Sequence, residues 1–127
     1  MNAALYRHAK LHTKALLALA TDVKGYEWLI DYDLKVFDGQ GSFVLRPDIA
    51  GLDPGTKEVR AAVDVSDSTL GYDLSEKKAL YATAGVEWYV VIDCKAGKVL
   101  VYRNAGKSLQ EAASGHPFAA LSDIFRE

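Results

Sequence analysis

Residues 59–66 read VRAAVDVS, a run that is mostly apolar on both faces if the chain is extended. Such a strand is typical of a central position in a sheet, because both of its faces have to be covered. Asp64 interrupts the run, and a carboxylate buried among apolar side chains destabilises a fold unless a cation or hydrogen-bond donors compensate it. The segment therefore predicts a covered sheet with a compensated acid inside it.

The elements before this strand follow from the spacing of apolar residues. Spacings of three and four over residues 3–19 predict an amphipathic helix, and alternation over 27–37 predicts a half-buried strand. A turn at 38–41 leads to a second strand at 42–50, so that the two strands are expected to form a hairpin. The Gly- and Pro-containing residues 51–57 predict a loop.

After the central strand the chain is expected to leave the sheet and form a helix. Asp73 or Ser75 is the expected N-cap, and the helix is expected to run to about Thr83 and to end at Gly85. Four further elements are predicted: a strand at 87–93, its hairpin partner at 99–104, a weaker strand at 109–112 and a short helix at 118–125. The order α-β-β-β-α-β-β predicts a mixed α/β fold, one sheet flanked by helices.

Length and composition limit the class of protein. The 127 residues contain one cysteine, which predicts no internal disulfide, no cysteine-based zinc site and a reducing, cytoplasmic location. The run of roughly 18 apolar residues that a membrane span needs does not occur. Fifteen basic against 17 acidic residues argue against tight binding of many phosphates, although an acidic metal site in a nuclease stays compatible with this balance.

Three polar positions are candidates for chemistry: Asp48 after Pro47, Asp64 in the central strand, and Lys77 one turn after Asp73. Two carboxylates from adjacent strands can share a hard divalent cation, and a nearby lysine can bind a phosphate or orient a water molecule. These residues are therefore candidates for metal-assisted phosphodiester hydrolysis.

Each of these positions also has a structural interpretation. Pro47-Asp48 can end a strand and begin a turn, and Asp64 can form an ion pair with Lys77 without any metal. Asp73 can cap a helix, or can form a surface pair with Lys77 four residues later. His8 and His12 are four residues apart, but without an HExxH arrangement they are interpreted as an exposed helix face rather than as a zinc site.

The order of these residues resembles the putative restriction endonuclease family of bacteria, a branch of the PD-(D/E)xK nuclease superfamily. The likeness begins at Arg46-Pro47-Asp48 and continues through residues 63–93. Its points, in order, are Asp64-Val65-Ser66-Asp67-Ser68-Thr69, Asp73, Lys77, Tyr81, Gly85-Val86, Trp88 and Asp93. The resemblance implies a restriction endonuclease-like core, a mixed sheet flanked by helices, in a single domain over residues 1–127.

The resemblance also implies residue roles. Asp48 and Asp64 correspond to the metal-binding acids, and Mg²⁺ or Mn²⁺ is the implied cofactor. The usual catalytic lysine lies two residues after the second acid, where this chain has Ser66. The role of that lysine is therefore expected to pass to Lys77, and Asp73 is expected to assist without itself binding the metal. The implied activity is metal-dependent hydrolysis of DNA phosphodiester bonds, and a homodimer is expected by analogy with nucleases that cut two strands.

The sequence departs from the family pattern at two places. Asp64 stands where the family usually has Glu, which draws the carboxylate back by more than about 1 Å, a displacement that can cost roughly a hundredfold in rate. The acidic Glu-Leu-Ile-Asp-Gly segment that commonly precedes the first helix in the family is expected to be missing. The alternative hypothesis is accordingly a catalytically inactive nuclease-fold protein that acts in binding or assembly.

Overall fold

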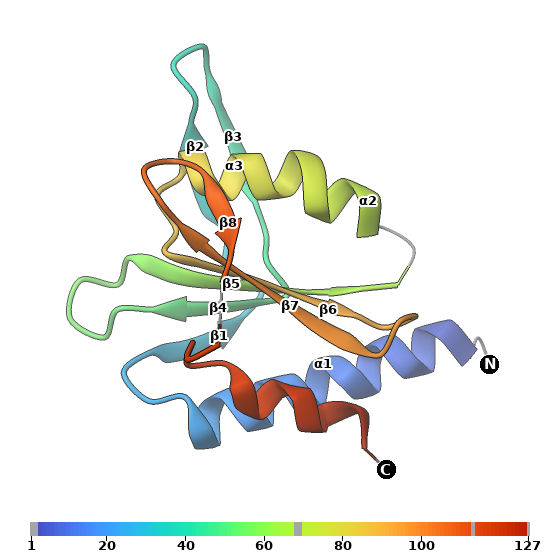
Figure 1. Ribbon diagram of the computed structural model, residues 1–127. Coiled ribbons are helices and arrows are strands. Elements are labelled where there is room, and N and C mark those ends of the chain that lie inside the picture. Colours follow the sequence, from blue (N-terminus) through green and yellow to red (C-terminus); the bar gives the residue numbers. More distant parts are fainter. Residues whose placement is uncertain (1–2, 68–69, 113, 127) are drawn as a thin grey trace.

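The computed structural model describes residues 3–67, 70–112 and 114–126, and its centre is a six-stranded sheet between two helical layers (Figure 1). The sheet order is β1-β4-β5-β6-β7-β8, and β2 and β3 form a separate two-stranded sheet. The strands are β1 Glu27–Ile30, β2 Leu34–Phe37, β3 Ser42–Leu45, β4 Ile49–Leu52, β5 Val59–Ser66, β6 Trp88–Asp93, β7 Lys98–Asn104 and β8 Leu109–Glu111. The helical segments are α1 Ala3–Asp22, α2 Leu70–Tyr72, the π-helical η1 Asp73–Lys77, α3 Lys78–Thr83 and the 3-10 helix η2 Ala119–Phe125.

Strand β5 has the central position that its sequence predicts. It pairs antiparallel with β4 and parallel with β6, and its residues from Ala61 onward are buried. Alternate residues face different layers: Ala61, Val63 and Val65 pack with α1 and η2, whereas Ala62 packs with α3 and the β2–β3 sheet. Asp64 follows the same alternation, and its carboxylate therefore faces the α3 side.

The two arms of the predicted first hairpin pair antiparallel as expected, but neither arm is one continuous strand. Residues 27–37 form two strands, β1 and β2, in different sheets, and residues 42–52 likewise divide into β3 and β4. Asp31 breaks the first ladder with a left-handed φ of 55°, which Asp tolerates better than most residues. Pro47, between β3 and β4, has no N–H to donate to a ladder. The observed order therefore has two more strands before β5 than α-β-β-β-α-β-β predicts.

The helix after β5 ends as predicted but begins earlier. Its C-cap Ala84 is followed by Gly85 at φ +80°, a backbone conformation that favours glycine. Helical backbone is already present at Leu70, so Asp73 lies inside the helical segment and is not its N-cap. Asp73 is instead buried, and its carboxylate accepts a hydrogen bond from Ser66 of β5.

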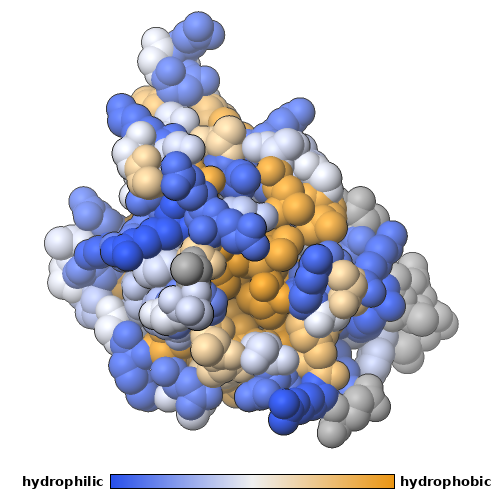
Figure 2. All heavy atoms as spheres, viewed as in Figure 1, coloured by the Kyte–Doolittle hydropathy of each residue, from blue (hydrophilic) through white to orange (hydrophobic). Residues whose placement is uncertain are grey.

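The two layers leave part of β7 uncovered. Figure 2 shows apolar side chains gathered where β7 crosses the viewed face between the α2–α3 layer and the layer of α1 and η2. Val99 and Leu100 of β7 are only half-buried.

Within the described residues, no helix is long and apolar enough to span a membrane.

Gly51 in β4 allows a tryptophan to lie flat against the sheet. Trp28 is its partner in the β1–β4 ladder, and a Cβ placed on Gly51 would lie 2.6 Å from Cζ3 of the indole. The ring cannot move away freely, because its Nε1 donates a hydrogen bond to the Val23 carbonyl at 3.0 Å. The edge strand β1 is therefore positioned by a contact that only glycine permits.

We expect Gly51→Ala to lower the free energy of unfolding by about 1–3 kcal/mol, the usual cost of overpacking. Gly41→Ala is the matched control, since a Cβ there meets nothing within 4 Å and its φ is not left-handed. Urea denaturation of both variants measures the difference. Equal midpoints for the two variants would contradict the role assigned to Gly51.

Candidate active site

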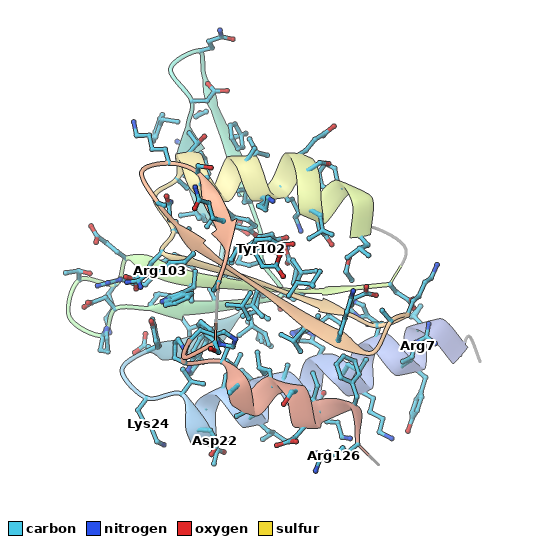
Figure 3. All side chains as sticks on the ribbon, viewed as in Figure 1. Arg7, Asp22, Lys24, Tyr102, Arg103 and Arg126 are labelled. Atoms are coloured by element: carbon cyan, nitrogen blue, oxygen red, sulfur yellow. The ribbon has the colours of Figure 1, made fainter. Side chains whose placement is uncertain are left out.

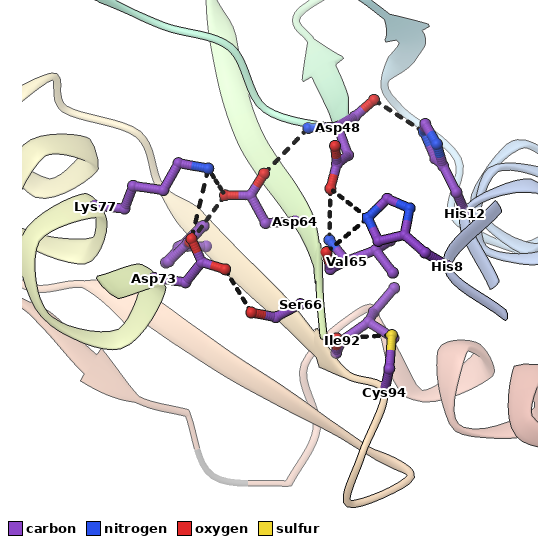
Figure 4. A network of polar contacts seen from close by, with 11 residues as sticks. His8, His12, Asp48, Asp64, Val65, Ser66, Asp73, Lys77, Ile92 and Cys94 are labelled. Carbon is purple, nitrogen blue, oxygen red and sulfur yellow. Dashed lines mark hydrogen bonds and ion pairs between the residues drawn. The ribbon is translucent and has the colours of Figure 1, made fainter. Parts of the chain in front are cut away.

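The carboxylate of Asp64 is the buried centre of a polar network (Figure 4). Its Oδ2 accepts hydrogen bonds from Lys77 Nζ at 3.0 Å and from the Tyr89 hydroxyl at 2.9 Å. Its Oδ1 accepts a third bond from the backbone N–H of Asp48 at 3.1 Å. The compensation that the sequence requires for this acid is thus supplied by one cation and two neutral donors from three different parts of the chain.

Asp48 lies in the short connection between β3 and β4, beside the end of β5. Its Oδ2 accepts a hydrogen bond from the Val65 N–H at 2.7 Å, while its own N–H bonds Asp64. The two acids therefore hold each other's strands through reciprocal side-chain to backbone bonds. The Asp48 side chain is 32 % exposed and that of Asp64 only 3 %, so Asp48 is the member of the pair that solvent reaches.

Lys77 and Asp73 complete the network from the helix. Lys77 Nζ lies 3.6 Å from Asp73 Oδ1, and the Ser66 hydroxyl donates to Asp73 Oδ2 at 2.5 Å. The side chains of Lys77 and Asp73 are only 19 % and 3 % exposed, so the interpretation as a solvated surface pair is wrong. The structure thus brings together the four residues that the sequence singles out: Asp48, Asp64, Asp73 and Lys77. Ser68 and Thr69, two further points of the family pattern, lie outside the described residues.

The site carries more negative than positive charge. Burial raises the pKa of Asp64, and the neighbouring Lys77 offsets this only in part. For Lys77 burial acts to lower the pKa, but the carboxylates of Asp64, Asp73 and Asp48 outweigh it, and the pKa is raised. Three carboxylates thus lie around one lysine, and a second cation would be stabilised there.

Two tyrosines line the cluster and differ in their hydrogen bonding. The rings of Tyr81 and Tyr89 pack at 4.7 Å, and both pKa values are raised, by burial first and then by the charge of Asp64. Tyr89 donates to Asp64, whereas the buried Tyr81 hydroxyl finds no hydrogen-bond partner among the described residues. Tyr89 is not among the residues that the sequence singles out as functional. The signal for it is its place in β6, two residues before Val91, which pairs with Asp64, so that both side chains share one face of the sheet.

The sequence predicts that His8 and His12 lie on an exposed face of α1, whereas the structure shows both rings only partly exposed and directed at the site (Figure 4). Nε2 of His8 is 3.0 Å from the Val65 carbonyl oxygen and 4.0 Å from Asp48 Oδ2. Nε2 of His12 is 3.1 Å from the Asp48 carbonyl oxygen. Both imidazoles are half-buried and face the site (Figure 4). Their spacing of four was visible in the sequence, but the packing of α1 against this end of β5 was not.

The donor atoms of the site are of the type that a divalent cation prefers, although they do not form a preorganised metal cluster. In residues 3–67, 70–112 and 114–126, no three His, Cys, Asp or Glu side chains converge as a metal cluster. Asp48 and Asp64 nevertheless offer oxygen donors in a site of excess negative charge, and carboxylate oxygens are the preferred ligands of Mg²⁺ and Mn²⁺. The residues therefore fit such an ion, with Asp48 as the accessible ligand.

The model of the Uma2 family, described as a putative restriction endonuclease, matches residues 28–126. The chain belongs to the Uma2 family. The match includes Asp48, Asp64, Asp73 and Lys77, and it confirms the family resemblance seen in the sequence. No curated protein matches the chain.

Solved structures confirm the fold. The crystal structure of a putative nuclease of DUF820 from Anabaena variabilis ATCC 29413 superposes with a TM-score of 0.68 at 15% identity, over 94% of this chain and 80% of that one. The type IIG restriction endonuclease BpuSI superposes with a TM-score of 0.57 at 15% identity, over 93% of this chain but only 15% of the enzyme. This Uma2 chain therefore has a restriction endonuclease-like fold, the mixed α/β class that its sequence predicts.

The two tyrosines provide a matched test of the network. We expect Tyr89→Phe to lower the free energy of unfolding by about 1–3 kcal/mol, because the buried Asp64 carboxylate loses a donor. Tyr81→Phe removes a hydroxyl with no partner among the described residues and should be neutral or slightly stabilising. Thermal and urea unfolding of both variants check this. A loss in Tyr81→Phe as large as that in Tyr89→Phe would contradict the hydrogen-bond assignment.

Proposed function

We propose that this protein is a metal-dependent endonuclease that hydrolyses DNA phosphodiester bonds. The observation that carries the proposal is the interlocked pair of Asp48 and Asp64 beside Lys77. A purely structural ion pair needs one acid for one lysine, whereas this site places three carboxylates around a single amine. Membership of the Uma2 family and the nuclease-like fold support the same activity.

The residues have distinct roles in this proposal. Asp48 and Asp64 hold Mg²⁺ or Mn²⁺; such an ion lowers the pKa of a bound water molecule and neutralises charge on the phosphate. Lys77 is oriented by Asp64 and Asp73 on the α3 side of the sheet, from which its ammonium can bind the scissile phosphate or the attacking water. Asp73, itself bonded to Ser66, keeps Lys77 in place.

DNA is the proposed substrate, and a homodimer in the cytoplasm is the proposed form of the protein. The neighbour BpuSI is a restriction endonuclease, which supports DNA over other phosphodiesters. The net charge of −2 indicates that few phosphates are bound. Figure 3 shows Arg7 and Arg103 at opposite ends of the molecule, with Lys24 and Arg126 away from both, so these cations do not form one patch. A second copy would supply a second site for the complementary strand.

One observation favours the alternative, a catalytically inactive nuclease-fold protein. The Asp64 carboxylate is already compensated by three hydrogen bonds, one of them from Lys77 at 3.0 Å. A buried acid paired in this way is stable without a metal ion. The two candidates therefore differ in whether a cation binds and whether DNA is then cut.

We expect Asp48→Asn and Asp64→Asn each to reduce Mn²⁺-dependent nicking of supercoiled DNA by about a hundredfold or more, because each removes a charged ligand of the metal. Asparagine keeps one acceptor oxygen, which can serve Lys77 and Tyr89 in Asp64→Asn and the Val65 N–H in Asp48→Asn, whereas the Asp48 N–H loses its acceptor in Asp64→Asn. Circular dichroism therefore has to show that each variant is folded before its activity is compared. Asp22→Asn, at the exposed end of α1, is the control with the same chemical change and should cut at the wild-type rate.

Three results separate the candidates. Metal-dependent nicking that both site variants lose supports the endonuclease. Nicking that persists unchanged in Asp64→Asn would show that the assigned site is wrong. Absence of nicking by the wild-type protein with either Mg²⁺ or Mn²⁺, across supercoiled, linear and single-stranded DNA, favours the inactive alternative.

A further inference from the structure

An imidazole from α1 stands at the solvent-facing side of the two acids. His8 Nε2 lies 4.0 Å from Asp48 Oδ2 and 3.0 Å from the carbonyl oxygen of Val65, the residue that follows Asp64. Its side chain is 37 % exposed, close to the 32 % of Asp48, so a cation from solvent can reach both. Figure 4 shows the ring directed at these oxygens rather than away from the site.

The position of this nitrogen suits a ligand of the same ion that Asp48 would bind. Two donors of one octahedral ion at about 2.1 Å lie roughly 3.0 Å apart when adjacent and about 4.2 Å apart when opposite. The distances from His8 Nε2 to the Val65 oxygen and to Asp48 Oδ2 fall within that range. Both separations are therefore compatible with one small cation that contacts His8 Nε2 together with these oxygens.

The contact between the His8 ring and the Val65 carbonyl oxygen requires a proton on Nε2. A carbonyl oxygen only accepts, so Nε2 carries the proton where it meets Val65. A metal ligand has to present a lone pair instead of an N–H, so binding of a cation at Nε2 would require the tautomer that carries its proton on Nδ1.

We propose that His8 is a third side-chain ligand of the metal ion and makes the site selective for Mn²⁺ over Mg²⁺. This inference rests on the proposed metal-dependent function and deepens it. Mg²⁺ strongly prefers oxygen donors, whereas an imidazole nitrogen is a good ligand for transition metals, for which affinity rises along the first row from Mn²⁺. A site built only from Asp48, Asp64 and backbone oxygen would show this preference more weakly.

His12 offers a matched control for His8. It lies one helical turn further along α1, and its Nε2 contacts the Asp48 main-chain oxygen at 3.1 Å rather than the carboxylate. His8→Gln and His12→Gln are thus the same chemical change on the same helix face. In both, the glutamine amide keeps a donor for the carbonyl oxygen that the histidine contacts.

The test is binding of Mn²⁺ alone and of Mg²⁺ alone to the full chain by isothermal titration, with pulsed EPR of the bound Mn²⁺. We expect the wild-type protein to bind Mn²⁺ at least about tenfold more tightly than Mg²⁺ and to show nitrogen coupling to the ion. His8→Gln should lose the coupling and about tenfold or more in Mn²⁺ affinity, with little change for Mg²⁺. His12→Gln should retain both properties of the wild type.

The outcomes distinguish this inference from the proposed function. Mn²⁺ that binds, depends on Asp48 and shows no nitrogen coupling would overturn the role of His8 and leave the endonuclease proposal in place. The same holds if His8→Gln and His12→Gln bind Mn²⁺ as the wild type does. If wild-type protein and Asp48→Asn both fail to bind Mn²⁺, the metal site and the ligand role of His8 are both wrong. The spectroscopic result on the wild type does not depend on how any variant folds.

Discussion

The burial of Asp64 in the central strand is the constraint on which the rest of the site depends. A carboxylate on a side chain that is only 3 % exposed has to be compensated, and its partners come from outside β5. The helix supplies Lys77, β6 supplies Tyr89, and the connection to β4 supplies a backbone N–H. One costly side chain thus ties together three elements that are distant in sequence.

The reciprocal bonds between Asp48 and Asp64 turn this compensation into a rigid site. Asp48 bonds the Val65 N–H and Asp64 bonds the Asp48 N–H, so neither carboxylate can rotate without losing a hydrogen bond near the sheet. Rigid placement is what catalytic or ligand-binding groups need, because small displacements of such groups lower rate or affinity. The same bonds also stabilise the fold, so the metal-binding role proposed for these acids would coincide with a structural one.

The site has a buried side and a solvent-accessible side. Lys77, Asp73 and Tyr89 lie on the α3 side of the sheet, where burial is deepest, whereas Asp48 and His8 are the members that solvent reaches. The excess of carboxylates over lysine favours a cation, and the exposed side is where one can enter. A nuclease fold accounts for this asymmetry more directly than a salt bridge does, because a structural pair has no need of an accessible acid.

The sequence by itself determined the local elements and the identity of the acids. Periodicity, turn residues and motif order are local signals, and they suffice to predict strand β5, the β6–β7 hairpin and the end of the helix at Gly85. The same signals single out Asp48, Asp64, Asp73 and Lys77. Only the tertiary structure decided the division of the first hairpin, the early start of the helix and the approach of His8 and His12. These depend on which surfaces pack together, and α1 reaches the site across 57 residues of chain between His8 and Val65, a contact that no local pattern encodes.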